Sequence, residues 1–204
     1  GGSCFGFVQT SYMVWDSIQL FKEFFPKTGP WISDKLYDLP LNEHNRKSIN
    51  YMMVSQMRKQ LLTYYTALWG KGPVYTLQQT KKMMSDTTSN DYRGIAMWNT
   101  NGPGGHIVNP YKILIDSIDQ NIEYIYVYDN NMPNDTTRKI TIKKNENKWY
   151  YNVSPNANAQ ASQWGGNNAT YGLLLSWKSS DFYSKPETDS IWYKTSHIEI
   201  YPTV

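Results

Sequence analysis

The residues best suited to covalent chemistry are one cysteine and one histidine, each a short distance after two glycines. Cys4, the single cysteine of the chain, follows residues 1–3 (Gly-Gly-Ser) at the start of a segment with helical spacing. Unpaired backbone N–H groups and the helix dipole lower the pKa of a thiol at such a position. His106 follows Gly104 and Gly105 and opens an apolar strand, which leaves space beside its imidazole for a substrate backbone. A nucleophilic cysteine needs such a base, so this pattern predicts thiolate attack by Cys4 with His106 as the base.

An acid at the end of the next predicted strand is placed to orient His106. Asp129 directly follows the tyrosine-rich strand predicted over 124–128. Successive side chains of a strand alternate between faces, so Asp129 and Asn130 should point to opposite sides. We predict that Asp129 holds the Nδ1 proton of His106 and thereby turns Nε2 toward the thiol. The alternatives are that residues 129–131 only form a turn and that Cys4 is a buried structural thiol or a lipoprotein anchor.

The elements that must position these residues form a helical half and a strand half. Apolar spacing predicts helices over 4–25, 43–69 and 77–84, with Ser3, Asn42 and Thr76 as N-caps and Pro26 and Gly70 as stops. Runs rich in Ile, Val, Tyr and Thr predict strands over 92–98, 106–115, 123–128, 137–143, 148–153, 172–177 and 190–201. Residues 154–171 indicate a long loop. We therefore expect one α+β domain over 1–204, mainly helical over 1–90 and mainly β over 91–204.

Three motifs, in this order, resemble the papain-like cysteine peptidase superfamily. They are Gly-Ser-Cys-Phe-Gly at a helix start, Gly-Gly-His-Ile-Val opening a strand, and Tyr-Ile-Tyr-Val-Tyr-Asp-Asn-Asn closing the next strand. The Cys-His-Asp order is similar to bacterial branches such as the bacteriocin-processing and streptococcal immunoglobulin-degrading types. The resemblance implies a papain-like fold that acts on peptide or protein, with Cys4 as nucleophile, His106 as general base and then acid, and Asp129 as orienting residue.

One departure from the superfamily concerns the oxyanion donor. Papain-like enzymes carry a Gln a few residues before the cysteine, whereas only Gly1, Gly2 and Ser3 precede Cys4 in this chain. The donor would then be the backbone N–H of Cys4 together with another group, or a group from an upstream segment. Gln9 lies too far inside the predicted helix to substitute.

Three residues indicate where a substrate would lie, and the sequence is also compatible with other functions. Gly104, Gly105 and Trp98 are predicted to border the substrate groove, and Trp164 is a further candidate. Transfer of the acyl group to an amine uses the same three residues and stays open. In a different class, 17 Tyr and 8 Trp with abundant Asn suit a module that binds carbohydrate or protein, or a catalytically inactive peptidase-like fold.

Composition excludes several other classes. Hydrophobic residues at 40% and charged residues at 18% exclude a disordered chain, and no apolar run is long enough to span a membrane. A net charge of +3 with scattered basic residues argues against a nucleic-acid partner. One cysteine and three histidines predict no metal site, and we expect no cofactor. The composition suits a secreted or surface protein of a low-GC bacterium, with a signal peptide absent or already removed; the oligomeric state is not predicted.

Overall fold

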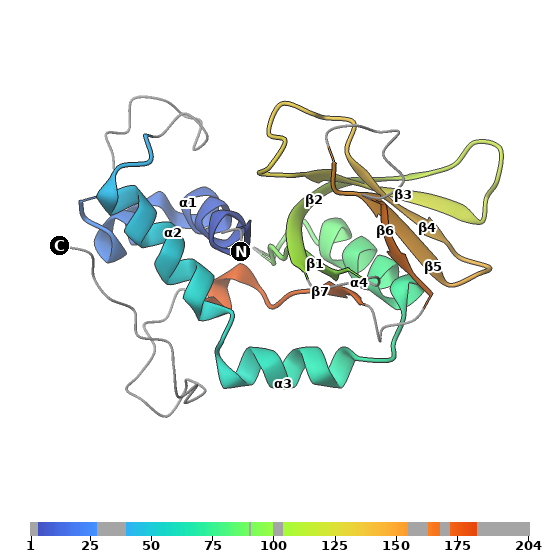
Figure 1. Cartoon of the computed structure of the whole chain (residues 1–204), viewed down its shortest axis with the longest axis horizontal. Helices are drawn as coiled ribbons and strands as arrows, with labels where there is room; N and C mark the ends of the chain where they lie inside the picture. The colour runs from blue at the N-terminus through green and yellow to red at the C-terminus, as the bar shows by residue number, and fades with distance from the viewer. Residues whose placement is uncertain are drawn as a thin grey trace.

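The computed structural model describes residues 4–27, 40–89, 91–99, 104–154, 163–167 and 172–182. In these ranges four helices precede an antiparallel sheet of seven strands (Figure 1), which agrees with the α+β class predicted. The helices are α1 (Cys4–Phe24), α2 (Glu43–Ser55), α3 (Lys59–Leu68) and α4 (Pro73–Ser85). The strands are β1 (Ile95–Trp98), β2 (Gly105–Ile115), β3 (Ile122–Tyr128), β4 (Lys139–Lys143), β5 (Lys148–Asn152), β6 (Gln163–Gly166) and β7 (Leu173–Leu175), followed by the short 3-10 helix η4 (Ser179–Phe182).

The first helix begins at Cys4, as predicted, and packs closely on α2. Gly6 makes this approach feasible, because a Cβ at that position would lie 2.2 Å from the carbonyl oxygen of Ile49 in α2. Further along, Ser17 has non-helical backbone angles and kinks the helix. The predicted N-cap Ser3 lies outside the described residues. The close contact between α1 and α2 fixes the direction in which α1 presents its first residue.

The prediction of a single helix over 43–69 is wrong, because α2 and α3 are separate helices. Arg58 lies between them with extended backbone angles (φ −60°, ψ 132°). Its guanidinium is buried and donates through Nη1 to the carbonyl oxygen of Asp181 in η4, at 3.0 Å. Neither Gly nor Pro marks the break in the sequence, so the apolar spacing continues across it and gives no warning.

The helix caps agree with prediction at one helix and differ at another. Oδ1 of Asn42 accepts the N–H of Asn45 at 2.9 Å, which confirms Asn42 as the N-cap of α2. The last helix starts four residues earlier than predicted, at Pro73, whose fixed φ suits the first helical position. The predicted cap Thr76 therefore lies inside α4, and its hydroxyl donates to the carbonyl oxygen of Leu173 in β7.

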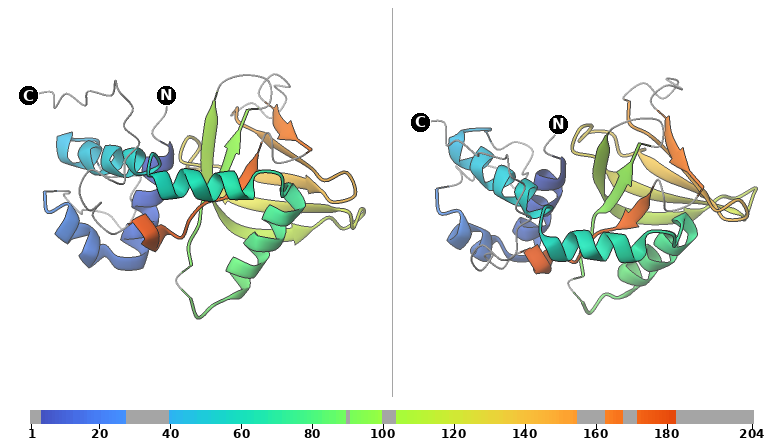
Figure 2. Two further views of the ribbon diagram at one scale, coloured as in Figure 1. Left: turned by 90° about the horizontal axis from the view of Figure 1, so that it is seen from below. Right: turned by 60° about the horizontal axis from the view of Figure 1, so that its bottom comes forward.

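The sheet has the strand order β6-β5-β4-β3-β2-β1-β7, and all its neighbouring pairs are antiparallel. Its long strand β2 joins two parts, since residues 105–108 pair with β1 and residues 109–115 pair with β3. The β2–β3 register shifts just after Pro110, which cannot donate a ladder hydrogen bond. Figure 2 shows the strands turning around α4, with α1 and α2 on the other side of β1 and β2.

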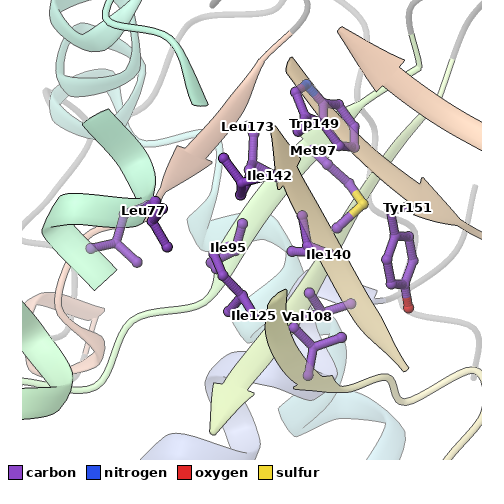
Figure 3. Close-up of a cluster of buried hydrophobic side chains, with 12 residues drawn as sticks. Leu77, Ile95, Met97, Val108, Ile125, Ile140, Ile142, Trp149, Tyr151 and Leu173 are labelled. Atoms are coloured by element: carbon purple, nitrogen blue, oxygen red, sulfur yellow. The ribbon is translucent and has the colours of Figure 1, made fainter. Parts of the chain in front are cut away.

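Two buried clusters meet across β1 and β2. The first, called the sheet cluster, joins Leu77 of α4 to inward side chains of the strands, among them Ile95 and Val108 (Figure 3). The second, called the helix cluster, joins Phe5 and Val8 of α1 to Ile107 of β2. Because successive residues of a strand face opposite sides, the first half of β2 contributes to both clusters and is buried on both faces. The start of β2 is thereby fixed beside the start of α1.

Most predicted strands are confirmed, with ends that differ by a few residues. The exception is the segment 154–171, predicted as a loop, where β6 pairs with β5. The strand predicted over 190–201 lies outside the described residues. No helix in the described ranges is long and apolar enough to cross a membrane.

Candidate active site

The fold brings Cys4 and His106 together. Cys4 is the first residue of α1 and half-buried, and His106 is the second residue of β2 and buried. The thiol and the imidazole are close enough that a hydrogen-bonding interaction between them shifts the pKa of each. Their contact follows from the packing of α1 on β2, where Phe5 and Ile107, the chain neighbours of the two residues, belong to the helix cluster. A helix-start cysteine and a strand-start histidine are therefore held in one place by the core.

The electrostatic surroundings of Cys4 and His106 favour a charged pair. Burial by itself raises the pKa of Cys4, but His106 and the backbone N–H groups of Ile107 and Phe5 outweigh it, so this pKa lies below its ordinary value. Burial would lower the pKa of His106, but Asp129 and Cys4 outweigh it and raise the pKa to about 9. Both shifts favour a thiolate beside an imidazolium. The thiolate is the nucleophilic form of cysteine, so the pair is suited to attack near neutral pH.

Asp129 lies against the imidazole on the side away from the thiol. Its side chain is fully buried, and Oδ1 lies 3.0 Å from Nε2 of His106. The ring N–H is not well aligned with this oxygen, and such alignment often improves only when substrate binds. Burial raises the pKa of Asp129, but His106 and Tyr151 outweigh this effect and hold the pKa below 3.8. Near neutral pH the carboxylate is therefore negative while His106 is an imidazolium.

The prediction that Nδ1 of His106 faces Asp129 is wrong. Nε2 of His106 faces Asp129, which leaves Nδ1 as the ring nitrogen available to Cys4. The sequence carries no signal for this choice, because it depends on rotation of the ring about a broad side-chain torsion. Asn130 does not replace Asp129: its amide donates to Oδ1 of Asn131 at 3.3 Å.

Sequence reasoning missed Tyr151, which contacts the other oxygen of the acid. Its hydroxyl donates to Oδ2 of Asp129 at 2.5 Å, and its ring centroid lies 6.4 Å from that of His106. Burial alternates along β5, with Trp149 and Tyr151 facing inward. The sequence did carry a signal for Tyr151, because strand alternation places this side chain in the core and a buried tyrosine hydroxyl usually needs a hydrogen-bond partner.

Two tryptophans flank the glycines that lead to the imidazole. A Cβ at Gly104, where φ is +140°, would lie 3.5 Å from the ring of Trp164, and one at Gly105 would lie 3.6 Å from the ring of Trp98. Trp98 also pairs with Gly105 across β1 and β2. Sequence reasoning missed Trp69, whose ring centroid lies 6.1 Å from that of Trp98 and which is about half exposed. The residues predicted to border a groove therefore lie together at the start of β2.

The two other histidines of the chain contribute nothing to the described site. His44 lies in the first turn of α2, and His197 falls outside the described residues. In the part of the chain that the structure describes, no group of three or more His, Cys, Asp or Glu side chains is arranged to hold a metal ion.

Comparisons of the chain with protein-family models, curated protein sequences and solved structures find no match.

Proposed function

We propose that the protein is a cysteine hydrolase of the papain-like type, most simply a peptidase that acts on peptide or protein amides. The observation that supports this best is the continuous contact from Cys4 through His106 to Asp129. A structural thiol has no need of a histidine whose pKa is raised, or of a buried acid behind that histidine. The arrangement of a helix-start cysteine against adjacent antiparallel strands also suits one papain-like domain built from both halves of the chain.

In the proposed reaction, Sγ of Cys4 attacks the amide carbonyl carbon and forms a C–S bond. The carbonyl oxygen becomes an oxyanion, which the backbone N–H of Cys4 would stabilise at the helix start. His106 then gives its proton to the departing amine as the C–N bond breaks, which leaves a thioester. Neutral His106 takes a proton from water, the hydroxide attacks the thioester, and release of the acid restores the thiolate–imidazolium pair.

The first prediction tests whether Cys4 is activated, without knowledge of the substrate. An ordinary thiol loses about tenfold in alkylation rate for each pH unit below its pKa of about 8.5. For Cys4, iodoacetamide should react nearly as fast near pH 6 as at pH 8, because His106 keeps the thiol ionised. Turnover of fluorescently labelled casein should fall above about pH 9, where His106 loses the proton it donates, while alkylation does not.

The outcome separates the two classes of function. A purely aromatic binding module, or an inactive peptidase-like fold, would show the steep pH dependence of an ordinary or buried thiol. Mass spectrometry of the labelled protein identifies the site directly, because Cys4 is the single cysteine. Slow, steeply pH-dependent labelling of Cys4 would overturn the proposed function.

A second prediction concerns the groove, at Gly105. A Cβ fits there without a close contact, whereas Gly104 has a backbone conformation that strains any other residue. Gly105→Val should therefore fold, while its methyl groups enter the space beside the ring of Trp98, which borders the predicted groove. We expect a peptidyl chloromethyl ketone to react at least about tenfold more slowly with Cys4 of this variant, because the peptide backbone is displaced.

Iodoacetamide is the matched control for Gly105→Val, since it is small enough to reach Cys4 without the groove. Its rate constant should stay within about twofold of wild type, and the melting temperature should change little. Equal slowing of both reagents would indicate damage to the Cys4–His106 pair, and no slowing of the peptidyl reagent would place the groove elsewhere.

A further inference from the structure

We propose that Tyr151 is a positioning residue of this site, which holds Asp129 charged and correctly oriented and so controls the reactivity of Cys4. This inference rests on the proposed function, and its test is chosen so that the two can fail separately.

The first support is that the two carboxylate oxygens of Asp129 have different hydrogen-bond partners. Oδ1 faces Nε2 of His106 at 3.0 Å and accepts the backbone N–H of Asn131 at 2.9 Å. Oδ2 accepts the hydroxyl of Tyr151. The carboxylate is fully buried, so the loss of a donor leaves an oxygen without a partner in a site where a charge is costly. Tyr151 therefore stabilises the ionised form and fixes the rotation of the group.

A second support is that Tyr151 is itself held by a buried cation. The guanidinium of Arg138 lies 5.2 Å from the centre of the Tyr151 ring and is almost fully buried. Its Nη1 donates to the carbonyl oxygen of Ser154 at 2.9 Å, and its Nη2 donates to that of Asn152. These carbonyls follow Tyr151 in the chain, so Arg138 ties down the end of β5 that carries the phenol. Figure 3 shows this hydroxyl at the margin of the sheet cluster.

The charged groups around Asp129 come from several elements. Cys4 on α1 and Asp129 after β3 are negative, while His106 on β2 and Arg138 before β4 are positive. Asp135 lies at the edge, 3.9 Å from Arg138 and more exposed. Burial and the charge of Asp129 both raise the pKa of Tyr151, so its hydroxyl remains a neutral donor throughout the working range. Tyr151 can therefore support the carboxylate at every pH at which the site operates.

The test is the pH profile of iodoacetamide labelling in Tyr151→Phe. Phenylalanine keeps the buried ring and removes the donor to Asp129, so Asp129 should take up a proton at higher pH. The protonated acid no longer supports the His106 imidazolium. A hydrogen bond to a charged group is worth about one pKa unit or more. The pH at which the labelling rate falls on the acidic side should therefore be higher by about one unit in Tyr151→Phe. The rate at pH 8 should stay close to wild type.

Tyr150→Phe is the matched control, because its ring faces the opposite side of β5 and lies near Lys143. It removes the same atom one residue away, and its profile should coincide with wild type. Adding Tyr151→Phe to Asp129→Asn should produce no further shift if Tyr151 acts through Asp129. A loss of rate that is equal at all pH values would mean a purely structural role, and an unchanged profile would also overturn the inference.

If the proposed function is wrong, wild-type Cys4 will already be labelled slowly near pH 6, whatever the behaviour of Tyr151→Phe.

Should Tyr151→Phe not fold, the wild-type protein still provides a measurement. The carboxyl ¹³C resonance of Asp129, assigned with Asp129→Asn, should show a deuterium isotope shift transmitted from the Tyr151 hydroxyl. Absence of that shift would overturn the positioning role.

Discussion

Replacing His106 with alanine is expected to reduce alkylation of Cys4 near pH 6 by about 100-fold or more. Without the imidazolium, burial acts on the thiol with little to oppose it, and an ordinary thiol is only about 0.3% ionised at that pH. Turnover should fall by at least about three orders of magnitude, because the same ring also donates the proton to the leaving group. Stopped-flow labelling and a labelled-casein assay measure the two effects.

Two further variants separate chemistry from folding in this experiment. His106→Gln keeps a polar side chain beside Asp129 but cannot carry the proton, so it should lose as much activity as alanine. His44→Ala removes a histidine from the first turn of α2, outside the site, and should behave as wild type. Labelling of His106→Ala at the wild-type rate near pH 6 would show that another group activates Cys4.

Replacing Asp129 with alanine should lower turnover by about two to four orders of magnitude, as the loss of orienting residues does in related triads. The carboxylate helps to raise the pKa of His106 to about 9, so its removal lowers that pKa. A neutral thiol–imidazole pair then competes with the charged pair between pH 6 and 8. Alkylation of Cys4 should consequently shift to higher pH.

Asp129→Asn and Asn130→Ala refine this prediction. The amide of Asp129→Asn can still orient His106 but brings no charge, so turnover should exceed that of the alanine variant while the pH shift remains. Asn130→Ala should lose far less, because Asn130 contacts Asn131 and not the imidazole. The assignment of Asp129 would be wrong if Asn130→Ala were inactive and Asp129→Ala behaved as wild type.

The three residues of the candidate site were predictable because each depends on a local signal. A cysteine at a helix start, a histidine after two glycines and an acid after a strand are visible in the sequence, and their order along the chain indicates the site. Strand alternation also separated Asp129 from Asn130 correctly. The helix start at Cys4 and the long strand from His106 were predicted for the same reason, since both have clear apolar periodicity.

Features that depend on tertiary contacts were not predictable. The break at Arg58 arises where a buried guanidinium reaches the carbonyl oxygen of Asp181, far along the chain. Strand β6 forms because its backbone pairs with β5, although its residues favour a loop. The position of Tyr151 on the inner face of β5 follows from alternation, but the identity of its partner depends on how β3 and β5 are placed around β4.

The two buried clusters have a consequence for how this protein would lose activity. Cys4 packs against the helix cluster, whereas Tyr151, which holds Asp129, belongs to the sheet cluster. A local opening that separates α1 from β2 would break the Cys4–His106 contact and leave the sheet intact. The rate at which Cys4 is alkylated would therefore measure how fully α1 is packed against β2. On heating, inactivation would precede loss of β structure, and a ligand bound across the junction would protect activity more than it protects the sheet.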